Sequence, residues 1–195
     1  RAFDIAFSLC VVVVGLAPIA LLLLIIRLES PGSPIYRQER IGYRGQPLRI
    51  FKLRTMVADS DDVEKHLSPE QLAQWRSERK VEDDPRVTRV GRFLRRTSLD
   101  ELPQFLNVLA GSMSIVGPRP VVADELPAYG TDVDAFLSMK PGITGWWQVQ
   151  ARNDATYEDG SRQQLELYYV RNANLKLDVV VFLETFKSII NKTGV

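Results

Sequence analysis

The hydrophobic and polar positions divide this chain into two unlike parts. Residues 5–26 form one uncharged apolar run, whereas the other positions mix apolar and charged side chains. A helix over this run is roughly 33 Å long, enough to cross a hydrocarbon core of about 30 Å. A signal peptide has a shorter apolar region and small residues at a cleavage site, which do not fit here. The run therefore predicts a membrane helix.

Pro18, which follows Ala17 inside the run, predicts an irregularity in this helix. A proline within a helix removes a backbone hydrogen bond and clashes with the preceding turn, so we expect a kink or a break. Two arrangements are compatible with the residues. In one, a kinked helix still spans the membrane; in the other, a re-entrant hairpin leaves both ends of the segment on the same side.

Alternating apolar and polar positions follow the run. Residues 35–43 and 48–54 flank a polar turn that contains glycine and proline, which predicts a short β-hairpin. Lys52 and Arg54 fall on the same face of the second arm, where they could bind one anion. Two charged side chains on an exposed strand are the alternative.

Helical periodicity dominates the rest of the chain. In residues 86–96, arginines recur every three positions and apolar residues recur on another face, which predicts an amphipathic helix. Residues 102–109 repeat the i, i+3, i+4, i+7 pattern, and we expect this helix to start near residues 98–100 with Pro103 in its first turn. Residues 178–190 predict another amphipathic helix at the surface. The fold class is therefore α+β, mostly helical, with a small β-hairpin.

Charge and rare residues exclude several kinds of site. The net charge of +1 gives no reason to expect a nucleic-acid partner. Cys10, the single cysteine, lies in the apolar run, so the chain has no disulfide framework or cysteine metal site. His66 is the single histidine and lies among acidic residues, which argues against a histidine metal site or a Ser-His triad.

Asp100 and Glu101 are the most informative polar residues. They are adjacent, they lie at a predicted helix start, and they directly follow a run of arginines, an arrangement that suits a phosphate compound. A structural alternative is a capping box, in which Ser98 and Glu101 bond each other's backbone amides. The spacing alone favours the cap; the neighbouring basic residues favour the site.

Two later segments add to this picture. Arg119 lies between Pro118 and Pro120, which hold it in an extended conformation suited to bidentate phosphate binding. Residues 140–149 predict a turn entering a short strand. If that strand continues, Trp146 and Trp147 point to opposite faces.

Four motifs in register resemble the bacterial sugar transferases, the monotopic polyprenyl-phosphate phosphoglycosyltransferases. They are FKLRTM at 51–56, VGRFLRRTSLDELPQ at 90–104, MSIVGPRP at 113–120 and KPGITG at 140–145. The resemblance covers essentially the whole chain. It implies transfer of a sugar 1-phosphate from a UDP-sugar to undecaprenyl phosphate, with release of UMP and with Mg²⁺ as cofactor. Residues 117–124 are most similar to enzymes that transfer galactose or glucose phosphate for exopolysaccharide or O-antigen synthesis.

The resemblance also implies roles for particular residues. Asp100 is expected to be the nucleophile that forms a covalent phosphosugar intermediate, and Glu101 to hold Mg²⁺ together with Asp100. Arg1 and Asp4 are candidates to meet the lipid phosphate. The expected phosphate-binding residues are Lys52, Arg54, Arg92, Arg95, Arg96 and Arg119.

The resemblance favours the re-entrant arrangement and a location at the bacterial inner membrane. Residues 1–30 are then a re-entrant membrane helix with a break near Ala17-Pro18, and residues 31–195 a catalytic domain facing the cytoplasm. Members of the family often have Ser-Pro at the break, whereas this chain has Ala-Pro. A longer, full-length protein is expected to form a homodimer. The rival hypothesis is a membrane-anchored scaffold that binds anionic lipid without catalysis.

Overall fold

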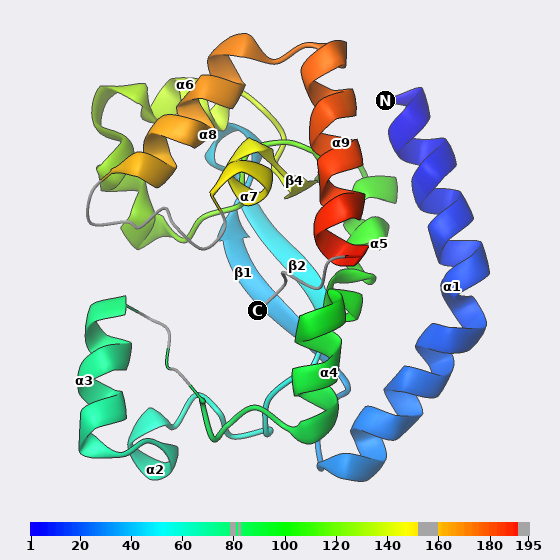
Figure 1. Cartoon of the computed structure of the whole chain (residues 1–195), viewed down its shortest axis with the longest axis vertical. Helices are drawn as coiled ribbons and strands as arrows, with labels where there is room; N and C mark the ends of the chain where they lie inside the picture. Colours follow the sequence, from blue (N-terminus) through cyan, green and yellow to red (C-terminus); the bar gives the residue numbers. More distant parts are fainter. Residues whose placement is uncertain (79–80, 82, 152–159, 191–195) are drawn as a thin grey trace.

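A central β-hairpin is surrounded by helices (Figure 1). The structure is a computed structural model, and it describes residues 1–78, 81, 83–151 and 160–190. The hairpin consists of β1 (Ile35–Ile41) and β2 (Pro47–Leu53), which pair antiparallel. The mostly helical α+β class and the hairpin predicted from the sequence are therefore confirmed.

The remaining elements are short apart from the first and last helices. The elements before the second sheet are α1 (Ala2–Glu29), the 3₁₀ helix η1 (Tyr43–Gly45), α2 (Val63–His66), α3 (Pro69–Glu78), α4 (Arg89–Thr97), η2 (Leu99–Glu101) and α5 (Gln104–Leu109). The others are β3 (Ser114–Val116), η3 (Ala123–Asp132), α6 (Val133–Leu137), β4 (Gly142–Thr144), α7 (Trp146–Gln150), α8 (Ser161–Asn172) and α9 (Leu175–Ile190). Strands β3 and β4 form a separate parallel pair.

Helix α1 is continuous through Pro18 and curves along one side of the domain (Figure 1). It is long and apolar enough to cross a membrane, and little of its apolar stretch is buried within the protein. The helix continues on both sides of the proline, so the structure shows no interruption at Ala17-Pro18, and the break expected there stays a prediction. Pro18 is exposed and removes a single backbone hydrogen bond, a loss that an apolar helix tolerates. The re-entrant arrangement is not confirmed.

Both ends of α1 are fixed to the domain. At its start, Arg1 Nη1 donates to the carbonyl oxygen of Val108 (2.8 Å), and the Asp4 carboxylate accepts from the Ser114 hydroxyl (3.0 Å) and the Ile115 amide (3.2 Å). These contacts tie the first turn of α1 to the end of α5 and to β3. Arg1 and Asp4 thus serve local structure, and their predicted contact with a lipid phosphate stays a prediction.

At the other end of α1, Arg54 forms hydrogen bonds to the segment that follows the helix. Its guanidinium donates to the carbonyl oxygens of Ser30 (2.7 Å) and Pro31 (2.6 Å) and to the Ser30 hydroxyl (2.8 Å). The side chain is buried, and burial lowers its pKa from the usual value. These donors have partners within the fold, and the anion site that the strand pattern suggested for Lys52 and Arg54 stays a prediction.

Two apolar clusters pack the hairpin against the helices. Leu48 and Ile50 of β2 pack with Val108, Met113 and Ile115 around α5 and β3. Leu53 packs with Ile26 of α1 and Leu94 of α4. The hairpin therefore joins α1, α4 and α5 into one unit, which places the turn between α4 and α5 beside β2.

Three predicted elements differ from the structure. Helix α4 begins at Arg89, after the Thr88 N-cap, and Arg86 lies outside it. The single helix expected over residues 98–109 is instead η2 followed by α5, so the carboxylates lie in a 3₁₀ turn. The strand after Lys140 ends at Thr144, and both tryptophans belong to α7 rather than to extended chain.

Candidate active site

Asp100 and Glu101 lie in the turn between α4 and α5. Helix α4 ends at Thr97, its C-cap residue Ser98 has a left-handed backbone with φ of 55°, and the next residues form η2. The Ser98 side chain makes no capping hydrogen bond, so the capping box expected from the spacing is absent. The cap does not form because Ser98 already terminates the preceding helix, and a left-handed residue cannot present its side chain as an N-cap does. The Glu101 carboxylate is therefore left for another partner.

Asp100 has unusual electrostatics for an aspartate. Burial and the neighbouring charge of Glu101 raise its pKa to about 6, while Lys52 and Arg95 oppose the rise. The carboxyl is thus poorly hydrated but flanked by two cations. A carboxylate with few waters to remove is a better nucleophile than a solvated one, provided that it is ionised.

Glu101 is paired with Lys52. The distance from Lys52 Nζ to Glu101 Oε1 is 3.0 Å, and the two side chains are 27% and 28% exposed. Lys52 extends from β2, so the hairpin contributes a cation to the turn that carries the carboxylates. The phosphate-binding role expected of Lys52 stays a prediction; the structure shows its ion pair with Glu101.

Arg95 is held in place by a buried threonine. Its Nε donates to the Thr55 hydroxyl (2.9 Å), and burial lowers its pKa from the usual value. Helix α4 approaches the Thr55 backbone so closely that a Cβ at Gly91 would lie 1.9 Å from the Thr55 carbonyl oxygen. Glycine is therefore required there, because it permits the approach that brings Arg95 beside Asp100.

The other predicted arginines are placed differently. Arg92 and Arg96 are exposed on α4. Arg86 is buried and paired with Asp84, with 2.6 Å between Arg86 Nη2 and Asp84 Oδ2. Asp84 and Arg86 therefore neutralise each other within the fold, and the three-residue arginine repeat does not form one continuous basic stripe.

Arg119 belongs to a second polar cluster that the sequence did not reveal. Its backbone amide donates to Glu166 Oε2 on α8 (3.0 Å), and its guanidinium lies 5.7 Å from the ring centroid of Trp147. Arg162 lies over the same ring at 3.9 Å. Burial raises the pKa of Glu166 to about 7. Glu166 lies 47 positions from Arg119, too far for any local pattern to connect them.

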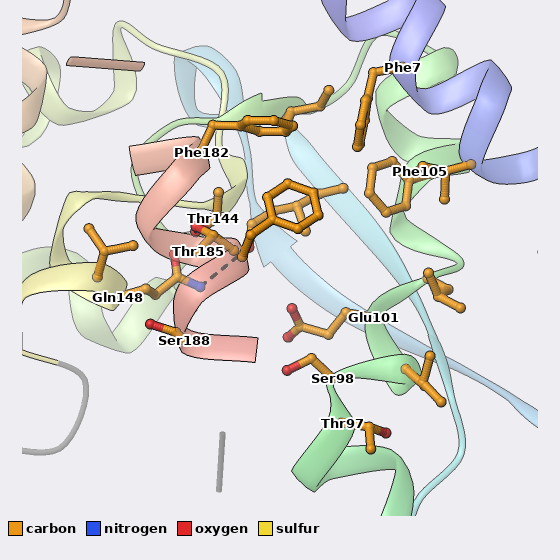
Figure 2. A pocket seen from close by; sticks show the side chains of 17 residues that line it. Phe7, Thr97, Ser98, Glu101, Phe105, Thr144, Gln148, Phe182, Thr185 and Ser188 are labelled. Carbon is orange, nitrogen blue, oxygen red and sulfur yellow. Dashed lines mark hydrogen bonds between the residues drawn. The ribbon is translucent and has the colours of Figure 1, made fainter. Parts of the chain in front are cut away.

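An apolar pocket of about 270 Å³ adjoins the carboxylate turn (Figure 2). Phe7 of α1, Phe105 of α5 and Phe182 of α9 lie at one end, and Glu101 and Ser98 lie at the other. The rings of Phe7 and Phe182 meet edge to face at 5.1 Å. The apolar pocket thus extends from the apolar helix α1 to the turn that carries Asp100 and Glu101.

The chain is similar in sequence to known bacterial proteins. A family model described as bacterial sugar transferase matches residues 1–192. The whole chain is 42% identical to undecaprenyl-phosphate galactose phosphotransferase of Salmonella typhimurium and covers 41% of it. It is also 40% identical to the exopolysaccharide production protein ExoY of Sinorhizobium fredii, of which it covers 86%.

A third relative is named as a glucose-1-phosphate transferase. The whole chain is 38% identical to UDP-glucose:undecaprenyl-phosphate glucose-1-phosphate transferase of Escherichia coli and covers 41% of it. The chain therefore spans less than half the length of two of these three relatives. The match of the family model over nearly all residues, with the four motifs in register, shows that the chain belongs to the bacterial sugar transferase family.

Proposed function

We propose that this protein transfers galactose 1-phosphate or glucose 1-phosphate from a UDP-sugar to undecaprenyl phosphate and releases UMP. This reaction is the first membrane step of surface polysaccharide synthesis. The observation that carries the proposal is the partly buried Asp100, flanked by Lys52 and Arg95 and placed beside a pocket that leads to α1. The names of the relatives from Salmonella typhimurium and Escherichia coli support the choice of lipid and sugars.

The reaction divides into two displacements at one phosphorus. A carboxylate oxygen of Asp100 attacks the sugar-bound phosphorus of the UDP-sugar, and UMP leaves with the bridging oxygen and its electron pair. An oxygen of undecaprenyl phosphate then attacks the same phosphorus, and the bond to Asp100 breaks. The products are the free carboxylate and a sugar linked to the lipid through a diphosphate. A covalent intermediate allows the two anionic substrates to react one at a time.

Lys52 and Arg95 supply positive charge where the phosphoryl group reacts. Both lie close enough to Asp100 to lower its pKa, so they favour the ionised carboxylate and offset negative charge on the phosphate. Arg119 is proposed to bind phosphate from the cluster around Trp147. Arg92 and Arg96, exposed on α4, are proposed to attract anionic substrates and lipid headgroups.

Asp100 and Glu101 fit Mg²⁺. This ion prefers oxygen ligands and is commonly held by one or two carboxylates together with substrate phosphates. The described residues contain no larger group of acidic, histidine or cysteine side chains, so the pair is the site proposed here. Lys52 bonds to Oε1 of Glu101, so Oε2 is the oxygen proposed to face the ion. When bound, the ion supplies charge neutralisation at the transferring phosphoryl group.

The contacts of α1 support a re-entrant or in-plane membrane helix. Its first turn bonds to Val108 and its last turn packs against Leu53, so both ends lie against one charged domain. A helix crossing the bilayer would carry one of these ends away from that domain. We therefore propose that α1 enters the inner membrane from the cytoplasmic face and that the catalytic domain stays on that face.

The decisive experiment separates the first displacement from the second. Detergent-solubilised protein is mixed with radiolabelled UDP-galactose or UDP-glucose and Mg²⁺ without lipid, and both UMP and label on the protein are measured. Wild type should release about one UMP per protein and retain the labelled sugar phosphate. Asp100→Asn should lower both by more than about 10³-fold, since a nucleophile acts as part of a unit. Asp134→Asn, at an exposed position on α6, is the matched control.

Each result has a definite meaning. Label on wild type and on Asp134→Asn but not on Asp100→Asn supports the covalent mechanism. Label on Asp100→Asn would show that another group is the nucleophile. No UMP from any donor, with or without undecaprenyl phosphate, would favour the lipid-binding scaffold.

A further inference from the structure

The walls of the apolar pocket differ from those expected of a nucleotide site. Glu101 is the only charged residue among the described residues that line it. A diphosphate carries several negative charges and needs cations or amides around it, whereas this wall offers a carboxylate. The pocket volume of about 270 Å³ is also slightly below that of typical ligand pockets, which is roughly 300–1,000 Å³. The nucleotide part of a donor is therefore excluded from this pocket.

The hydroxyl groups inside the pocket are largely satisfied by the protein itself. Thr144 and Thr185 share a hydrogen bond of 2.7 Å, and Thr97 donates to the carbonyl oxygen of Phe93 (2.8 Å). These side chains require nothing from a ligand. What the pocket offers a ligand is mainly apolar contact with Phe7, Val11, Phe105, Phe182 and Phe186. Such a surface stabilises a branched hydrocarbon by excluding water from it.

The two ends of the pocket define the orientation of its ligand. One end is bounded by Phe7 of α1, the helix apolar enough to enter a membrane, and Val11, one turn further along α1, also lines the pocket. The other end is bounded by Ser98 and Glu101, beside Asp100 (Figure 2). A ligand that runs between them has a hydrocarbon end in contact with the membrane helix and a polar end at the carboxylates.

We infer that this pocket holds the isoprene units next to the phosphate of the polyprenyl acceptor. This inference rests on the proposed function and adds where the acceptor lies. The small volume accommodates only the beginning of the chain, so the remainder follows α1 into the bilayer. Binding the first units there brings the lipid phosphate to the Asp100 intermediate and keeps the hydrocarbon out of the path of the water-soluble donor.

A bulky residue on the α1 wall tests the inference. Val11→Trp fills the pocket, and Val13→Trp on the same helix is the matched control, because Val13 is 58% exposed and does not line the pocket. We expect Val11→Trp to raise the KM for undecaprenyl phosphate about tenfold, and the lipid-independent UMP release is measured alongside it as a check on folding. Val13→Trp should match wild type in both measurements. An unchanged KM in Val11→Trp would overturn the inference.

A second measurement covers the case in which Val11→Trp fails to fold. Wild-type protein is irradiated with a polyprenyl phosphate that carries a diazirine on its first isoprene unit, and the labelled peptides are identified by mass spectrometry. Label on the segments around Val11, Leu102 and Phe186 supports the pocket. Label confined to the exposed apolar face of α9 around Leu175 and Val179 would overturn it. Absence of UMP release from wild type would instead refute the proposed function.

Discussion

Asp100 and Glu166 are both carboxyl groups whose pKa is raised chiefly by burial, yet their surroundings differ. Asp100 reaches about 6 with a second carboxylate beside it and with two cations, Lys52 and Arg95, opposing the rise. Glu166 reaches about 7 in the interior of α8, 1% exposed, and its principal partner is the Arg119 amide. Asp100 therefore lies next to another carboxylate and two cations, whereas Glu166 is almost fully buried, with Arg119 as the cation that acts on it.

The comparison shows that a raised pKa alone does not identify a catalytic carboxyl. Desolvation produces the same shift in a structural residue and in a nucleophile. Arg119 also opposes the rise at Glu166, so the distinguishing features of Asp100 are its neighbouring carboxylate, Glu101, and its position beside a pocket that reaches α1. Glu166 instead fixes the backbone of the Arg119 loop. We therefore expect substitutions at Glu166 to change stability and those around Asp100 to change chemistry.

The largest effect expected from this comparison is on stability. Glu166→Ala leaves the Arg119 amide without an acceptor and opens a cavity, which should lower the free energy of unfolding by about 2–3 kcal/mol. Glu166→Gln keeps an acceptor oxygen and should keep most of the stability and the lipid-independent UMP release. Chemical unfolding of the detergent-solubilised variants measures the difference. An alanine variant as stable as wild type would show that Glu166 does not support the loop.

The same residue predicts a pH dependence of stability. The folded pKa of about 7 exceeds the ordinary value of 4.5, so between these values the folded protein binds a proton that the unfolded chain lacks. The free energy of unfolding should therefore fall as pH rises through this window. Glu166→Gln should remove this part of the pH dependence. Equal slopes in wild type and the glutamine variant would contradict the raised pKa.

Local sequence patterns predicted the helices and strands that depend on neighbouring residues. The hairpin followed from alternation around a turn, and α9 followed from helical periodicity, although it begins at Leu175 rather than Asp178. The motif also marked Asp100 and Glu101, which lie beside Lys52; their role at a phosphate site stays a prediction.

Features set by distant contacts could not be predicted in this way. Arg54 binds the chain that leaves α1, and Arg86 pairs with Asp84, so neither follows the face that its spacing assigned. Ser98 is left-handed because it ends α4, which no capping pattern reveals. Glu166 meets Arg119 only because α8 packs against the loop after β3.

The next largest expected effect is on the rate of the first displacement, which should depend on pH. Asp100 must be ionised to attack, and with a pKa of about 6 only about a tenth is ionised at pH 5. The rate of lipid-independent UMP release should therefore fall about tenfold between pH 7 and pH 5. Lys52→Met removes a cation that lowers this pKa, so its midpoint should move to higher pH. Glu166→Gln should leave the midpoint unchanged; if it moves the midpoint and Lys52→Met does not, the roles of the two carboxyls are reversed.

The smallest expected effect is on kcat/KM, in variants of Thr55 that change how Arg95 is positioned beside Asp100. Thr55→Val removes the acceptor of the Arg95 Nε hydrogen bond with little change of volume, whereas Thr55→Ser retains it. A displaced Arg95 stabilises the carboxylate less, so Thr55→Val should lower kcat/KM for the UDP-sugar about three- to tenfold and move the pH midpoint upward. The serine variant should restore both values. Loss of stability without a change of midpoint would assign Thr55 to packing alone, since only a residue acting through Arg95 alters the charge that Asp100 experiences.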